Sequence, residues 1–220
     1  MNAPASARLI VILVLALMLG LQFTALMGDT KGKAEALKTS ISNCRKVVMA
    51  IKIYGADAQG TYPDAKVPGA KSSNEAFREL FRAGAIKSEA PFGCANSPFK
   101  PDGNIGKAAE GFLQAVEPGE NHWAMTKGLN DSSPGNLALV FENPVDAGWP
   151  PGWNADVAGQ SVKGRSWEEG KVIVGWNDSS VELMLLSATK GARVSFASEE
   201  APFPKHGPGV TFKVMDAAVK

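Results

Sequence analysis

The feature that most constrains this chain is an apolar stretch near its N-terminus. Residues 9–28 are twenty consecutive positions without a charge, bounded by Arg8 and Asp29. At about 1.5 Å of rise per residue, a helix of this length spans roughly 30 Å, the thickness of a bilayer's hydrocarbon core. We therefore predict a membrane anchor over residues 1–28, whose apolar positions include Leu9, Val11, Leu13, Leu15, Leu17, Leu19, Leu21 and Phe23.

The flanking charges predict how this anchor is oriented. Arg8 and the terminal amine favour an N-terminus that stays inside, which gives a single-pass inner-membrane protein with its C-terminal domain periplasmic or extracellular. The alternative is a cleavable signal peptide, which would release a secreted soluble protein. Its apolar region usually has about 7–15 residues and ends at a small-x-small site, and Leu26-Met27-Gly28 fits that pattern poorly.

The helix is expected to continue past the anchor and to end near Gly55. Its second half carries one apolar stripe with spacings of three and four, which is typical of a helix packed on one face. The stripe consists of Leu37, Ile41, Cys44, Val48, Ile51 and Tyr54. We expect the rest of the chain to cover it.

Short alternating or apolar runs after residue 120 predict strands. They lie at 122–127, 137–141, 172–176 and 181–185, with a further strand at 210–214, and a surface helix is expected at 74–84. The fold class is therefore α+β, with an antiparallel sheet laid across the amphipathic half of the N-terminal helix. This reading gives an α+β domain at 29–186 and an irregular C-terminal extension at 187–220.

Composition and motifs argue against several functions. Lysine and arginine total 23 against 22 acidic residues, so no basic surface for nucleic acid is expected. The sequence holds two histidines, His122 and His206, and has no Gly-x-Ser-x-Gly elbow and no phosphate-binding or dinucleotide-binding glycine motif. We therefore expect a protein that is not an enzyme and has no cofactor.

The two cysteines, Cys44 and Cys94, lie fifty positions apart and outside any CxxC pair. An extracytoplasmic domain is a place where disulfides persist, so we predict a Cys44–Cys94 disulfide. Two separate buried thiols are the alternative.

Two further features are candidate binding sites. Trp149 and Trp153 flank a Pro-Pro-Gly turn that could stack a sugar ring or a partner's side chain, although such aromatic residues often fold back to cap a sheet. Several loop carboxylates offer oxygen ligands for a structural calcium ion, without EF-hand spacing. These carboxylates are Glu142, Asp146, Asp156 and Asp178.

Two segments resemble bacterial prepilin-type proteins, the type IV pilin and type II secretion pseudopilin family. Residues 43–54 followed by Gln-Gly-Thr-Tyr-Pro at 59–63 resemble the end of that family's N-terminal helix. Residues 171–182 resemble its C-terminal hairpin, with Asp178-Ser179 where Asp-Gly is usual. The resemblance implies a long helix on an antiparallel sheet and a role in assembly.

The chain departs from the family at its N-terminus. The family's processing site, Gly-Phe-Thr-Leu-Ile-Glu, is missing, and no carboxylate occurs from Met1 to Gly28. We therefore expect an uncleaved, diverged member that associates through its membrane helix with other pilin-like subunits or secretion-system components. The alternative function is a ligand- or glycan-binding module on a membrane stalk, using the Trp149–Trp153 loop.

Overall fold

A computed structural model describes residues 5–197, 202–203 and 211–220, with side chains from residue 30 onward. The chain divides into two compact units, Met1–Lys38 and Thr39–Lys220. The side chains predicted to form the anchor, Leu9 to Phe23, lie outside the described residues. Within the described part, no helix combines the length and the apolar character needed to cross a bilayer.

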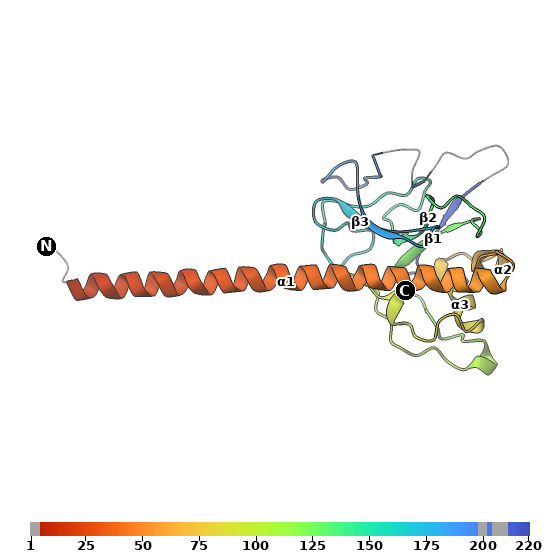
Figure 1. Cartoon of the computed structure of the whole chain (residues 1–220), viewed down its shortest axis with the longest axis horizontal. Coiled ribbons are helices and arrows are strands. Elements are labelled where there is room, and N and C mark those ends of the chain that lie inside the picture. Colours follow the sequence, from red (N-terminus) through yellow and green to blue (C-terminus); the bar gives the residue numbers. More distant parts are fainter. Residues whose placement is uncertain (1–4, 198–201, 204–210) are drawn as a thin grey trace. The chain divides into compact units, whose positions relative to one another are not determined.

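The second unit contains a five-stranded antiparallel sheet and short helices, as α+β predicts (Figure 1). The helices are α1 (Ala5–Asp57), α2 (Pro63–Lys66), α3 (Ser73–Arg82) and the 3₁₀ turns η1 (Ala90–Phe92) and η2 (Ala108–Glu110). The strands are β1 (Trp123–Lys127), β2 (Ala138–Glu142), β3 (Lys171–Trp176), β4 (Val181–Leu185) and β5 (Lys213–Met215). Their order in the sheet is β4-β3-β2-β1-β5, and every pairing is antiparallel.

The end of α1 packs on β3 at a glycine. A Cβ added to Gly175 would lie 2.5 Å from Val48 Cγ2 and 3.1 Å from Cys44 Sγ, so the helix approaches the strand backbone directly. Of the predicted stripe, Cys44, Val48 and Ile51 are fully buried, and Leu37, Ile41 and Tyr54 are half-buried.

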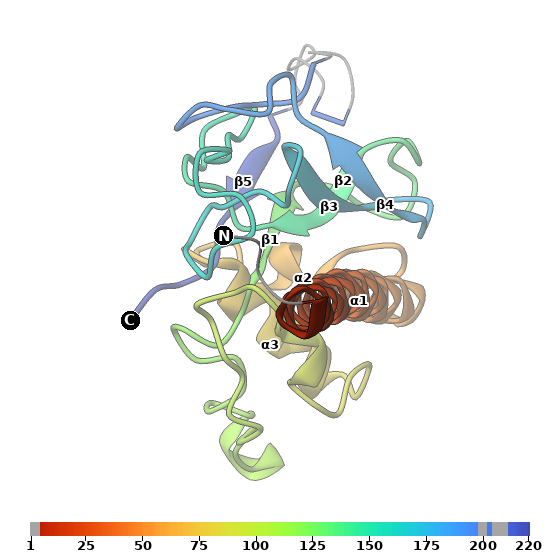
Figure 2. The same cartoon turned by 90° about the vertical axis from the view of Figure 1, so that its left-hand side faces the viewer.

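Loops cover the other face of the sheet. Val172, Val174 and Trp176 share this face because strand side chains alternate with a period of two, and they join a core cluster with Phe141 and Trp153. Figure 2 shows α2 and α3 on one side of the strands and the segment after β4 on the opposite side. The sheet is thus buried on both faces, which explains why β2 is apolar almost throughout.

The last described residues complete one edge of the sheet. β5 pairs with β1 through Met125 and Met215, and it extends over Lys213–Met215, where the sequence predicted a strand at 210–214. Ser73 N–H donates to Asp216 O at 2.9 Å, which ties the segment after β5 to α3. The second compact unit therefore includes residues 211–220.

Candidate functional site

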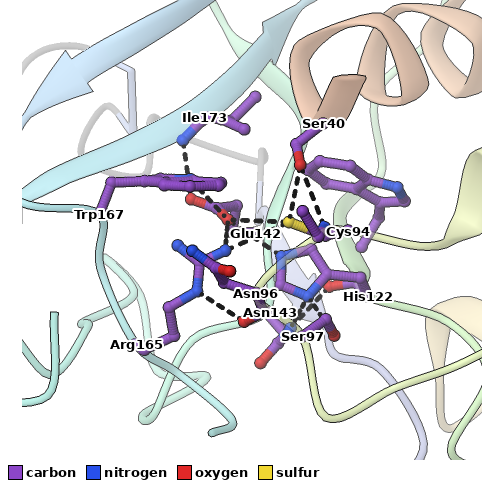
Figure 3. Close-up of polar contacts among 12 residues, drawn as sticks. Ser40, Cys94, Asn96, Ser97, His122, Glu142, Asn143, Arg165, Trp167 and Ile173 are labelled. Carbon is purple, nitrogen blue, oxygen red and sulfur yellow. Dashed lines mark hydrogen bonds and ion pairs between the residues drawn. The ribbon is translucent and has the colours of Figure 1, made fainter. Parts of the chain in front are cut away.

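The most polar part of the interior is a buried network centred on Glu142 at the end of β2 (Figure 3). Its Oε1 atom lies 3.0 Å from His122 Nε2, 2.9 Å from Arg165 Nη2 and 3.1 Å from Trp167 Nε1. Its Oε2 atom accepts the Ile173 N–H of β3 at 3.0 Å. Glu142, Arg165 and His122 are 0%, 1% and 2% exposed, so one carboxylate joins two loops and two strands out of contact with water.

The network holds Glu142 in its charged form. Burial alone raises the pKa of this carboxyl, but the Arg165 guanidinium and the His122 hydrogen bond outweigh burial and lower it below the usual 4.5. A carboxylate buried without such partners would cost several kcal/mol. Arg165 and Glu142 are therefore acceptable in the core only as a pair.

The hydrogen bonds around His122 assign its proton. Asn143 Oδ1 accepts the Gly164 N–H at 2.8 Å, so the Asn143 amide nitrogen faces the ring and donates to His122 Nδ1 at 2.9 Å. Ser97 Oγ accepts the Phe99 N–H and lies 2.8 Å from the same ring nitrogen. Nδ1 is therefore an acceptor, and the proton is on Nε2, where it is donated to the central carboxylate.

Both cysteines lie beside this network, and the structure contains them as free thiols. The Cys94 thiol donates to Ser40 Oγ at 3.2 Å and accepts from Arg165 Nη2 at 3.2 Å, while Cys44 packs on Gly175. Burial raises the pKa of Cys44 well above 9.0, so it stays protonated. The structure thus contains two separate buried thiols, the alternative to the predicted Cys44–Cys94 disulfide.

Two groups of side chains could supply ligands to a metal ion. Cys94, His122 and Glu142 have their ligand atoms within 4.8 Å of one another, a sulfur–nitrogen–oxygen set that suits zinc. The Glu142 carboxylate already forms an ion pair with Arg165, however, and each of the three side chains is at most 4% exposed. The network therefore serves to hold the strands and loops of the core together, and it is too deeply buried for a substrate to reach.

The second group consists of three acidic residues between α3 and β1, Glu89, Asp102 and Glu120, whose carboxylate oxygens also lie within 4.8 Å of one another. Glu89 Oε2 accepts the Gly103 N–H at 2.9 Å, and Glu120 Oε2 accepts the Glu117 N–H at 2.8 Å. Burial and the neighbouring carboxylates raise the pKa of Glu120. Backbone amides thus hold two of the three acids in place.

The four carboxylates predicted as calcium ligands do not come together. Glu142 is the centre of the network, Asp146 pairs with Arg193 at 2.6 Å, and Asp156 Oδ1 accepts the Gly191 N–H at 2.8 Å. Asp178 accepts the backbone N–H of Ser180 at 2.9 Å inside its own turn. Each acid has a separate local role, so the predicted calcium loop is not formed by these residues.

The proposed tryptophan platform is also not open to a ligand. Trp153 is 0% exposed, and its Nε1 donates to Glu142 O at 3.0 Å. Trp149 is half-buried, with ring centroids 5.1 Å from Phe203 and 5.7 Å from Phe212. Trp153 is thus part of the core, as the alternative reading of the sequence expected, and Trp149 packs against two phenylalanine rings.

The two segments that resemble prepilin-type proteins meet at one place. Tyr62 O–H donates to Asn177 Oδ1 at 2.6 Å, so the segment after α1 is tied to the β3–β4 turn. Lys52 of α1 donates to Tyr62 Oη and to Asn177 O, both at 3.0 Å, and forms an ion pair with Asp131. We call Lys52, Tyr62, Asp131 and Asn177 the helix-end clamp.

Sequence reasoning missed both the network and the clamp. One available signal was Glu142, a carboxylate that directly follows the apolar run Leu137–Phe141 and needs a buried partner. Arg165 gave no local signal, because a single arginine in a loop is normally solvated.

No family model, curated protein or solved structure matches this chain.

Proposed function

We propose that this protein is a membrane-anchored structural or assembly subunit of the pilin or pseudopilin kind, held in the inner membrane by residues 9–28. Its α+β domain stands outside the cytoplasm, and subunits or secretion-system components associate through their N-terminal helices. The protein is not an enzyme and needs no cofactor.

The observation that carries the proposal is the helix-end clamp. The Gln-Gly-Thr-Tyr-Pro segment and the hairpin turn were singled out separately for their resemblance to prepilin-type proteins, and they are 115 positions apart at Tyr62 and Asn177. Their side chains bond directly. Two resembling segments whose side chains bond to each other support membership of the family more strongly than two segments that lie apart would.

The buried network supports a structural role as well. His122, Glu142 and Cys94 are residue types that enzymes use, but they are sealed in the core and bonded to one another. Acid–base or nucleophilic catalysis needs a group within hydrogen-bonding reach of a substrate. The apolar stretch 9–28 also supports the proposal, because a helix of twenty uncharged residues suits a bilayer.

The test is the membrane association and N-terminal sequence of the chain purified from its native cells. We expect a species that begins at or near Met1, resists alkaline carbonate extraction and has a protease-accessible domain in spheroplasts. Leu13→Lys with Leu17→Lys should release it, because a charge at the centre of a spanning helix costs about 2.5–3.5 kcal/mol per residue. Leu113→Lys with Leu185→Lys, at exposed positions of the domain, is the matched control.

Two results would contradict the proposal. A wild-type chain in the soluble fraction that begins near Gly28 would identify a signal peptide instead of an anchor. A chain that stays a single copy in mild detergent at all concentrations, and cross-links to no other subunit in native membranes, would remove the assembly role.

A further inference from the structure

The second unit carries an open groove on a different flank of α1 from the one that packs on the sheet. The groove has a volume of about 610 Å³ and lies between residues 42–53 of α1 and the segment from Gly84 to Pro91. Its helical wall consists of Ser42, Arg45, Lys46, Met49, Ala50 and Ile53, a second stripe at helical spacing. α1 thus has one apolar flank covered by the sheet and another left open.

The floor of this groove is apolar and exposed. Met49 is 45% exposed and Ile53 is 48% exposed, although both are large hydrophobic side chains. They lie four residues apart on α1, one turn from each other, so they form a continuous strip rather than two scattered positions. The two side chains give the groove an apolar floor that the side chains of a partner can cover.

The walls are already fixed. Asn43 Nδ2 donates to Gly93 O at 3.0 Å, which holds the 90–93 segment against α1. At the other end of the same wall, the Ala85 N–H donates to Leu80 O at 2.9 Å, which fixes the chain where it leaves α3. A ligand would therefore find a formed groove and would not have to order it.

The rim of the groove is cationic. Arg45, Lys46 and Lys87 line it and are exposed, and within the described residues none of the three forms an ion pair. The described lining includes no carboxylate. An occupant that buries the apolar strip would bring these three cations next to its own flanks.

We propose that this groove binds an amphipathic helix of a partner protein, with an apolar stripe facing Met49 and Ile53 and acidic residues on both flanks. A helix matches the shape, because residues 42–53 present about three turns and roughly 16 Å of groove, the usual size of a helix-in-groove contact. Acidic flanks match the rim. A symmetric contact between two copies of this chain is disfavoured, since it would bring two cationic rims together.

The proposal does not depend on the membrane anchor, and its test uses two synthetic probes. Both are helical peptides of about fourteen residues, roughly 21 Å long, with the same leucine stripe and either glutamate or lysine on the flanks. Each is titrated by fluorescence anisotropy into the full chain in zwitterionic nanodiscs, with empty nanodiscs as the blank. We expect the glutamate peptide to bind at least about tenfold more tightly, and salt to weaken its binding.

Matched variants assign the binding to the groove. Ile53→Asp should lower the affinity for the glutamate peptide by about tenfold or more, whereas Leu185→Asp, at an exposed leucine of β4, should not change it. Lys46→Glu with Lys87→Glu should reverse the preference between the two peptides, and Lys190→Glu is the control for charge. All five positions are exposed, so an unchanged thermal unfolding curve is expected and serves as the folding check.

Three outcomes would overturn the proposal. Equal binding of the two peptides would remove the acidic partner, and binding unaffected by Ile53→Asp would place it elsewhere. A dimer of the chain in analytical ultracentrifugation that Ile53→Asp abolishes would identify a second copy as the occupant.

Discussion

Gly175 is the position at which the contact between α1 and the sheet can be measured most directly. Gly175→Ala adds a Cβ at 2.5 Å from Val48 Cγ2, 3.1 Å from Cys44 Sγ and 3.4 Å from Val140 O. Carbon atoms in contact normally lie about 3.5–4.0 Å apart, so the Val48 methyl must move by about 1 Å or the helix must shift. β3 has hydrogen-bonded neighbours on both sides and cannot easily yield. Overpacking of this kind costs about 1–3 kcal/mol, and the gain from stiffening a glycine in the unfolded chain, about 0.4–1 kcal/mol, offsets part of it.

We expect Gly175→Ala to lower the free energy of unfolding by about 2 kcal/mol. Val48→Ala should also cost about 2 kcal/mol, because it removes buried methyl groups and leaves a cavity. The double variant should cost at least about 1 kcal/mol less than the sum, since Val48→Ala removes the methyl that clashes. Urea unfolding of the full chain in mild detergent, followed by the fluorescence of the buried Trp123 and Trp153, gives all four free energies. A neutral Gly175→Ala, or single costs that simply add, would refute the close approach of α1 to β3.

Three other predictions concern the network, the clamp and the thiols. Glu142→Gln leaves Arg165 without its countercharge and should lower the free energy of unfolding by about 3–5 kcal/mol near neutral pH. Folding lowers the pKa of Glu142, so this contribution is present above the usual 4.5 and is lost as the pH falls through the folded value. The difference in unfolding free energy between wild type and Glu142→Gln should therefore shrink between about pH 7 and pH 3.5, and a constant difference would contradict the ion pair. Tyr62→Phe removes the donor to Asn177 and should cost about 1–3 kcal/mol in the same urea assay, whereas Tyr54→Phe should change stability by less than about 0.5 kcal/mol, and equal effects would argue against the clamp. Alkylation without reductant should leave the native chain unmodified and add two labels after denaturation, as intact mass will report, and no label on the denatured chain would restore the disulfide.

The elements of the fold were largely predictable because local patterns encode them. The alternation of Val172, Val174 and Trp176 indicated a strand with one buried face, and the spacing of Phe77, Leu80 and Phe81 indicated α3. These signals depend on neighbours within a few residues. They say which face of an element is buried and little about what buries it.

The candidate sites depend on contacts between distant segments, which local patterns do not carry. His122, Glu142 and Arg165 are each unremarkable in their own segment, and only the packing of two strands and a loop makes them one network. Trp153 shows the same limit for a binding site, since the sequence places it beside a Pro-Pro-Gly turn but does not show that Phe141 and Phe203 pack against its ring. The identity of a side chain was readable from the sequence, but its neighbours were not.

The pairing of β5 with β1 has a consequence for how the chain is made. β5 is synthesised after the other four described strands, and it supplies one edge of a sheet whose other strands come from residues 123–185. The N–H groups of Ser73 and Gly119 likewise find their acceptors in Asp216 and Ala218, which follow β5. A nascent chain therefore carries an unprotected β1 edge until residues 213–218 emerge, and such edges invite aggregation. Deleting residues 213–218 should thus lower the yield of folded protein during biosynthesis, and a holding chaperone would be needed most before this segment emerges.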